Sequence, residues 1–351
     1  MSIVSDHFTR AFGRDLTNIQ VQHDKLQKPN LRNKSAPRGS ILTNLNNANT
    51  RGYNYKNPKV SKPTPAVEQI YKQIAKEDKH NPSLVSDYQV SIFSYLRFNQ
   101  KQITNPQYMN SQTSITSDMR AILYDWLIKV HIKFKLVDEC LFMAINLIDR
   151  YLEKTKISRD KFQLLGITCL FISSKVEEIY PPHIKDFASV TNGACTKYDI
   201  IRMEGQLCKV LEFNLCIPSS LVFLNRYSRL DKNMASLNSK EYYLARYLLE
   251  LSFLDSKFLQ YTQANIAASS VYLSNQIFDK KEFWNEAQIH QSQFSEKEIR
   301  KCALDLYFFL QDVKKNSQFT EGVRNKFRGQ KYLEIADISI TYNNESSNRR
   351  L

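Results

Sequence analysis

Glycine is scarce in this sequence, with only eight among 351 residues, and none belongs to a glycine-rich loop that could cradle a phosphate group. No serine or cysteine lies in a recognisable nucleophile motif. Glu177 and Glu178 form a carboxylate pair, but adjacent residues on a helix point about 100° apart and cannot share a proton. Catalysis therefore has no support in the sequence, and we expect a protein that is not an enzyme.

Closely paired cysteines are also absent. The six cysteines occur singly within apolar stretches, without a C-x-x-C pair, at positions 140, 169, 195, 208, 216 and 302. Metal and redox motifs require paired ligands, so we expect buried free thiols, no metal site and no cofactor.

Long apolar runs are missing as well. The longest nearly apolar segment, Phe162 to Ile172, lies between Lys161 and Lys175 and is too short to cross a bilayer. Residues 1–6 show no signal-peptide pattern. The expected location is the nucleus and the cytoplasm, without membrane attachment.

Basic residues are concentrated near the N-terminus. The formal net charge is +14, and residues 1–66 contain eleven Lys or Arg against three acidic residues, together with five of the ten prolines. Such a polar segment cannot bury enough apolar surface to offset the entropy lost on ordering, so we expect a disordered tail. A basic tail can bind nucleic acid or a nuclear import receptor, or simply remain solvated, and the last interpretation requires the least.

From Val67 onward the apolar residues recur with helical spacing, which predicts an all-α fold. A short amphipathic helix is expected between Leu84 and Leu96. The sequence then predicts helices over 116–134, 138–154, 159–177, 183–190, 196–212, 219–230, 239–254, 262–278, 283–288, 295–313 and 319–328. Asn214 to Pro218 forms a break, because a residue before proline is disfavoured in helical geometry.

The helices on either side of this break form a repeat. Residues 166–173 resemble residues 267–274, since small residues precede a bulky apolar trio in both segments. We therefore expect two tandem five-helix bundles, each built around one of these segments. The predicted organisation is a basic tail (1–66), an N-terminal helix region (67–115), a first bundle (116–217), a second bundle (218–335) and a C-terminal tail (336–351).

The predicted helix 116–134 carries two apolar stripes, whereas an ordinary surface helix carries one. The first contains Met119, Ile122, Leu123 and Trp126, and the second contains Tyr124, Leu127, His131 and Phe134. Two stripes indicate either a central helix buried on all sides or a core face opposite an exposed binding face. Arg120 falls in line with the second stripe, where an unpaired charge would be costly, so we expect an ion pair with Asp149 on the next helix.

Four motifs follow one another along the predicted first bundle. They are MRAILYDWL at 119–127, NLIDRYL at 146–152, SSKVEEIYPP at 173–182 and LEFNL at 211–215. Their order and spacing resemble the cyclin box of A-type and B-type mitotic cyclins, and these motifs do not separate the two subtypes. The resemblance covers residues 81–338 and identifies each predicted bundle as a cyclin box.

The resemblance implies a regulatory subunit that binds and activates a cyclin-dependent protein kinase and so controls mitotic progression. In the family, binding through the first box pushes a kinase helix inward and opens the activation loop. Two polar contacts of the family match Lys175 and Glu204 here. The apolar contacts match Ile172, Val176, Cys208, Phe213 and Leu215.

Lys175 and Glu204 could also form an ordinary interhelical salt bridge, which contributes ~0–1 kcal/mol when exposed. The second repeat favours a binding role, because the position that matches Lys175 there is Gln276. Cys208 and Val176 are smaller than the leucine or aromatic residues often found at these positions in the family. This difference predicts a weaker kinase contact or a differently shaped partner.

The resemblance further implies a groove that docks Arg-x-Leu peptides of substrates and inhibitors. Its expected exposed wall is the stripe Met119, Ile122, Leu123 and Trp126, and its opposite wall is Arg159, Phe162 and Gln163. Lys129 occupies a position at which an acidic or neutral residue usually meets the peptide arginine. We therefore expect like-charge repulsion and weak binding of such peptides.

Mitotic cyclins also carry destruction signals in their tails, of the form R-x-x-L with an asparagine downstream. Arg10 and Asn18 have the required spacing without the leucine, whereas Arg38, Ile41 and Asn46 fit with isoleucine in its place. Both motifs are hypotheses, because short degenerate motifs arise readily in an asparagine-rich tail. They imply recognition by ubiquitin-ligase machinery.

A nucleic-acid-binding function is the alternative interpretation. Transcription factor IIB proteins also contain two cyclin-like repeats, and this chain is basic, with an isoelectric point of about 9.3. Those proteins begin with a zinc ribbon, however, and residues 1–66 contain no cysteine. The body also lacks a basic stripe interleaved with aromatic residues, so we expect no nucleic-acid partner.

Overall fold

The computed structural model describes residues 62–100, 104–234, 236–315 and 320–338. Within these ranges every regular element is a helix, which confirms the expected all-α fold. None of the described helices combines the length and apolar character needed to span a membrane. The candidate destruction motifs, with Arg10, Asn18, Arg38, Ile41 and Asn46, lie outside the described residues.

The first bundle follows the predicted order closely. Its helices are α5 (Ser117–Phe134), α6 (Asp138–Lys154), α7 (Arg159–Glu177), α8 (Ile184–Ser189) and α9 (Lys197–Val210). Thr116 and Thr196 cap α5 and α9, because each side-chain oxygen accepts a backbone N–H of the first turn. The apolar helix α7 packs against the other four and forms the centre of the bundle.

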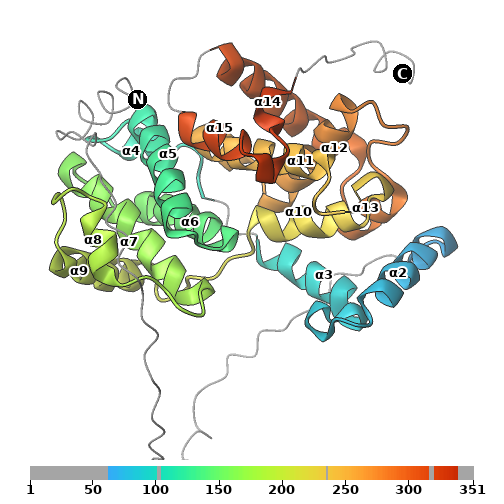
Figure 1. The fold of residues 1–351 in the computed structure, drawn as a ribbon, viewed down its shortest axis with the longest axis horizontal. Coiled ribbons are helices and arrows are strands. Elements are labelled where there is room, and N and C mark those ends of the chain that lie inside the picture. The colour runs from blue at the N-terminus through green and yellow to red at the C-terminus, as the bar shows by residue number, and fades with distance from the viewer. Residues whose placement is uncertain (1–61, 101–103, 235, 316–319, 339–351) are drawn as a thin grey trace, which may run out of the picture.

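The second bundle lies beside the first, as Figure 1 shows in yellow to red. It contains α10 (Ser220–Arg229), α11 (Lys240–Leu251), α12 (Gln263–Ile277), α13 (Glu286–Ser292), α14 (Glu296–Lys315) and α15 (Glu321–Phe327). Helix α12 packs against α10, α11 and α14, so it holds the central place that α7 holds in the first bundle. The prediction of a repeat built around these two segments is confirmed.

Two predicted helices of the second bundle have different bounds in the structure. The helix expected over 283–288 begins at Glu286, because Asn285 and Gln288 form a capping box, and it ends at Ser292. The helix expected over 239–254 ends at Leu251, and its last residues form a 3₁₀ turn, Ser252–Leu254.

The N-terminal region is less regular than the sequence predicts. Val85 adopts a left-handed conformation with φ of 47°, which separates two 3₁₀ turns (Pro82–Leu84 and Ser86–Tyr88). The expected helix therefore begins later, as α3 (Gln89–Asn99), because a left-handed residue cannot continue a right-handed helix. A four-residue helix, α4 (Tyr108–Ser111), completes the connection to α5.

An additional helix, α2 (Pro65–Asp78), precedes α3 and packs on the second bundle (Figure 1). Its N-cap is Thr64, so the expected tail boundary at residue 66 falls within the first turn of α2. The buried side chains of Val67 and Ile74 form a small cluster with Leu230 and Ala287. The N-terminal region is thus anchored to the second bundle.

The expected pair between Arg120 and Asp149 is present and fully buried. The Arg120 Nη2 and Nε atoms lie 2.7 and 2.8 Å from the two carboxylate oxygens of Asp149. The hydroxyls of Tyr108 and Tyr124 also donate to Asp149. Arg120 Nη1 donates to the carbonyl oxygen of Phe253 at 2.7 Å, so the pair joins α5, α6 and the second bundle.

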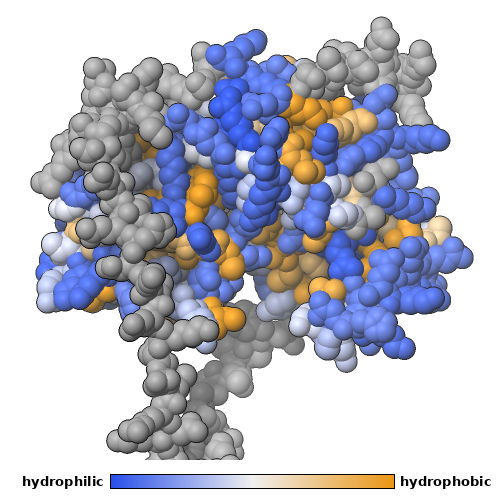
Figure 2. Space-filling view, in the orientation of Figure 1, coloured by the Kyte–Doolittle hydropathy of each residue, from blue (hydrophilic) through white to orange (hydrophobic). Residues whose placement is uncertain are grey.

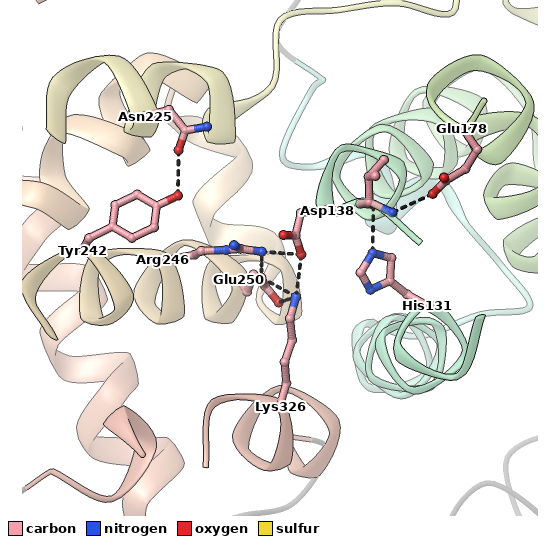
Figure 3. A network of polar contacts seen from close by, with 9 residues as sticks. His131, Asp138, Glu178, Asn225, Tyr242, Arg246, Glu250 and Lys326 are labelled. Carbon is pink, nitrogen blue, oxygen red and sulfur yellow. Dashed lines mark hydrogen bonds and ion pairs between the residues drawn. The ribbon is translucent and has the colours of Figure 1, made fainter. Parts of the chain in front are cut away.

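A second buried network crosses the seam between the bundles (Figure 3). Lys326 on α15 donates to both oxygens of Glu250 on α11, at 2.7 and 2.9 Å, and to Asp138 on α6 at 3.2 Å. Arg246 on α11 also pairs with Asp138. Burial would raise the pKa of Asp138, but the charges of Lys326 and Arg246 lower it below its usual range. These ion pairs fix the two bundles relative to each other.

Helix α15 also docks directly on α5. The Asp125 carboxylate accepts the backbone N–H of Gly322 at 2.6 Å. A Cβ atom at position 322 would lie 2.6 Å from the carbonyl oxygen of Asp125, so only glycine allows this approach.

On the face drawn in Figure 2, hydrophilic residues predominate and interrupt the apolar patches.

Candidate functional site

The structure brings Lys175 and Glu204 together as an ion pair. Lys175 lies in the last turn of α7, and Glu204 lies on α9. The Lys175 Nζ atom also lies 4.5 Å from the centre of the Phe171 ring. The side chain of Lys175 is 40% exposed and that of Glu204 is 23% exposed, so both are accessible to a partner.

The chemistry of the pair suits recognition of a protein backbone. An ammonium group has three donors, and the carboxylate of Glu204 holds it in one place. The second bundle has Gln276 at the matching position, where the amide donates to the hydroxyl of Tyr272 at 3.0 Å. Since the second bundle has a comparable central helix without such an ion pair, the helical arrangement itself does not require Lys175.

The five apolar residues expected beside the pair differ in exposure. Val176 is 45% exposed and Phe213 is 75% exposed, whereas Ile172 and Cys208 are buried and Leu215 is partly buried. Ile172 therefore belongs to the core of the first bundle. Burial, and next the charge of Glu204, raise the pKa of the Cys208 thiol.

The backbone after α9 explains why Phe213 is exposed. Glu212 and Phe213 have positive φ angles of 54° and 56°, which are unfavourable for residues other than glycine. The Phe213 N–H donates to the carbonyl oxygen of Cys208 at 2.9 Å and so closes a turn at the helix end. This turn directs a large aromatic side chain into solvent next to α9.

Four further exposed apolar residues lie on the same two segments as the pair, and the sequence analysis did not predict a role for them. Ile179 and Tyr180, in the loop after α7, are 86% and 90% exposed. Tyr198 and Ile201 are also exposed, and they precede Glu204 at intervals of three residues on α9. We call the exposed set the α7–α9 face: Lys175, Val176, Ile179, Tyr180, Tyr198, Ile201, Glu204 and Phe213.

Most residues expected to line the docking groove are buried in the core. Leu123 is completely buried, and a Cβ atom on Gly166 of α7 would lie 2.9 Å from its side chain. Trp126 is 7% exposed, so the prediction of an exposed stripe was wrong for these two residues. Helix α7 packs against α5 and covers Leu123. Met119 and Ile122 are half-buried.

The opposite wall is similar, because Phe162 and Gln163 are buried and only Arg159 is exposed. At Lys129 the structure shows two ion-pair contacts, and the expected weak binding of Arg-x-Leu peptides stays a prediction. The Lys129 Nζ atom lies 3.0 Å from the Asp125 carboxylate and 3.6 Å from that of Glu321, so its charge is compensated. Burial raises the pKa of Asp125, and Lys129 opposes that effect.

The thiols are mostly buried, and the described residues contain no cluster of possible metal ligands. Five cysteines are buried free thiols as expected, whereas Cys216 is exposed. Across residues 62–338, as far as the structure describes them, no cluster of three His, Cys, Asp or Glu side chains could hold a metal ion.

Two tandem all-helical bundles, with a lysine–glutamate pair on an apolar face of the first, define the class of protein. The family description "Cyclin, N-terminal domain" matches residues 91–216, and "Cyclin, C-terminal domain" matches residues 218–341. The chain therefore belongs to the cyclin family.

Individual relatives agree with this assignment. The chain is 35% identical to a G2/mitotic-specific cyclin-B of Dictyostelium discoideum, over 78% of this chain and 62% of that protein. It is 34% identical to a G2/mitotic-specific cyclin-B of Marthasterias glacialis, over 76% of this chain and 67% of that protein. A viral cyclin from herpesvirus saimiri shares the fold, with a TM-score of 0.55, 16% identity, and coverage of 63% of this chain and 97% of that structure.

Proposed function

We propose that this chain is a non-catalytic regulatory subunit that binds and activates a cyclin-dependent protein kinase in mitosis. The observation that carries the proposal is the Lys175–Glu204 pair, placed among exposed apolar residues on the α7–α9 face. The similarity to mitotic cyclin-B proteins supports the kinase class and the stage of the cell cycle.

The α7–α9 face would act by differential binding. A kinase that alternates between inactive and active arrangements is shifted toward whichever arrangement the face binds more tightly. Lys175 donates to backbone carbonyl oxygens of the kinase helix, and Glu204 keeps that ammonium in position. Tyr180, Ile201 and Phe213 add the apolar area that makes the bound arrangement favourable.

Three further parts of the proposal rest on the family resemblance. Arg-x-Leu substrates or inhibitors would dock near Met119, Ile122 and Arg159, the accessible part of the expected groove. Ubiquitin-ligase machinery would recognise the tail before residue 62. The protein would be present in both nucleus and cytoplasm.

Substitution of the pair tests the central claim. We expect Lys175→Ala and Glu204→Ala each to weaken kinase binding by ~2–5 kcal/mol, because each leaves a charged partner uncompensated at the interface. The melting temperature should change little, because both side chains are partly exposed.

Lys72→Ala is the matched control, because Lys72 forms an exposed pair with Glu68 at 2.8 Å on α2, outside the α7–α9 face. Binding would be measured by calorimetry with a purified mitotic cyclin-dependent kinase, and activation by histone phosphorylation. Normal activation by both Lys175→Ala and Glu204→Ala would show that the pair does not have this role.

A further inference from the structure

Gly205 is an unusual exposed residue of α9, next to Glu204 of the α7–α9 face. It lies in the interior of α9, where glycine costs about 1 kcal/mol relative to alanine. A Cβ atom at this position would have no neighbour within 4 Å, and the backbone has no positive φ angle there. Neither packing nor backbone conformation within the chain therefore requires glycine at position 205.

The neighbours of Gly205 on α9 belong to the α7–α9 face. Glu204, the partner of Lys175, is the preceding residue. Ile201 lies one turn before Gly205 on the same side of the helix and is 52% exposed, and Tyr198 lies two turns before it and is 66% exposed. Bare helix backbone is thus exposed next to large apolar side chains.

A contrast with the other glycines supports this interpretation. Gly166 and Gly322 are both explained by contacts within the chain, since a Cβ atom would lie 2.9 Å from Leu123 in one case and 2.6 Å from Asp125 in the other. Gly205 has no such contact. The neighbouring Cys208 and Val176 are also small, and the large exposed side chains along α9 lie before and after this position, at Tyr198, Ile201 and Phe213.

We propose that Gly205 is the point of closest approach between α9 and a kinase helix, and that it selects a kinase with a bulky apolar side chain at that contact. This inference rests on the proposed function, because the kinase is its occupant. The distance between packed helices depends on the side chains at the contact, and a missing side chain permits a shorter distance. A leucine or phenylalanine of the kinase would then lie directly against the backbone of α9.

A size series at position 205 tests the inference with one purified mitotic cyclin-dependent kinase. Gly205→Ala is expected to raise the melting temperature by about 2 °C, since alanine favours the helix and has space. Gly205→Leu is expected to leave folding intact but to weaken kinase binding by at least about ten-fold. The loss should grow with the volume of the side chain.

Gln206→Leu is the matched control. It is exposed on the same turn, but its side chain points about 100° away from position 205. Its binding should stay within about two-fold of the original chain. Lys175→Ala is measured in parallel, so that the two proposals can be distinguished.

The outcomes separate the inference from the proposed function. If Gly205→Leu binds as tightly as the original chain while Lys175→Ala does not, the role of Gly205 is overturned and the proposed function stands. A lowered melting temperature of Gly205→Ala would also overturn it, because the position would then be constrained by the fold. If the original chain does not bind the kinase, both proposals fail.

Discussion

Lys129 has a structural role that its position in the sequence does not reveal. It lies between the carboxylates of Asp125 and Glu321, and so helps to hold α15 on α5. Because these carboxylates partly neutralise Lys129, the like-charge repulsion of a docking peptide should be smaller than the sequence predicts.

We expect Lys129→Glu to lower the free energy of unfolding by ~1–3 kcal/mol, because three carboxylates would then meet and Asp125 is buried. Lys133→Glu, at an exposed position one turn further along α5, should have little effect. Thermal unfolding compares the two variants, and equal melting temperatures would show that Lys129 makes no structural contribution.

His131 makes stability depend on pH. It is buried, and its Nε2 atom lies 2.9 Å from the Val137 carbonyl oxygen. The charges of Lys326, Glu250 and Asp138 also act on it. Burial and the charge of Lys326 lower its pKa. The unfolded chain therefore takes up a proton below about pH 6.5 more readily than the folded chain, so stability falls as pH falls through that range.

We expect the melting temperature to drop between pH 7 and pH 5.5, and to drop less in His131→Gln, whose amide can still donate to Val137. His80→Gln, at an exposed site, is the control and should retain the full drop. The measurement is thermal unfolding across this pH range at constant ionic strength. Identical pH profiles for His131→Gln and the original chain would assign the dependence to other groups.

At the scale of helices, the sequence predicted what is local. The spans 116–134, 138–154 and 159–177 match α5, α6 and α7 to within one residue, because caps and apolar spacing determine them. The side of α5 that is exposed could not be predicted in the same way. Leu123 and Tyr124 belong to different stripes, yet both are completely buried, because helices distant in sequence cover both sides.

The candidate site was also predicted only in part, because some of its features depend on contacts that the local sequence does not show. Lys175 and Glu204 could be paired from their positions in motifs, whereas the exposure of Ile179 and Tyr180 depends on a loop with no periodic pattern. Helix α2 was not predicted as a separate element, because Val67 and Ile74 are its only buried apolar residues. Its buried apolar side chains contact the second bundle, far along the chain.

The ion-pair network between the two bundles depends on Glu250. Glu250 is completely buried and accepts two bonds from Lys326. Glu250→Ala would leave Lys326 and Arg246 buried with only Asp138, and should cost ~3–5 kcal/mol of stability. Glu68→Ala, which breaks an exposed pair with Lys72, is the control and should cost less than ~1 kcal/mol. Chemical denaturation measures both, and a small loss for Glu250→Ala would mean that the network contributes little.

At the scale of the whole molecule, α2 joins the N-terminal region to the folded body. The hydroxyl of Tyr71 lies 2.8 Å from Nδ1 of His290 on α13, and Asp78 pairs with Arg229 on α10. These contacts involve the second bundle and lie apart from the α7–α9 face. Stability, kinase activation and turnover should therefore respond differently to truncation on either side of α2.

Two truncated chains separate these properties. A chain lacking residues 1–61 keeps Thr64 and the whole of α2, so it should melt and activate kinase as the full chain does. A chain lacking residues 1–79 exposes Leu230 and Ala287, and we expect it to melt about 5 °C lower or more while it still binds kinase.

If the tail carries destruction signals, both chains should persist through mitosis for longer than the full chain. Equal half-lives after metaphase would remove the tail signals from the proposal, whereas an unchanged melting temperature without α2 would show that its packing contributes little.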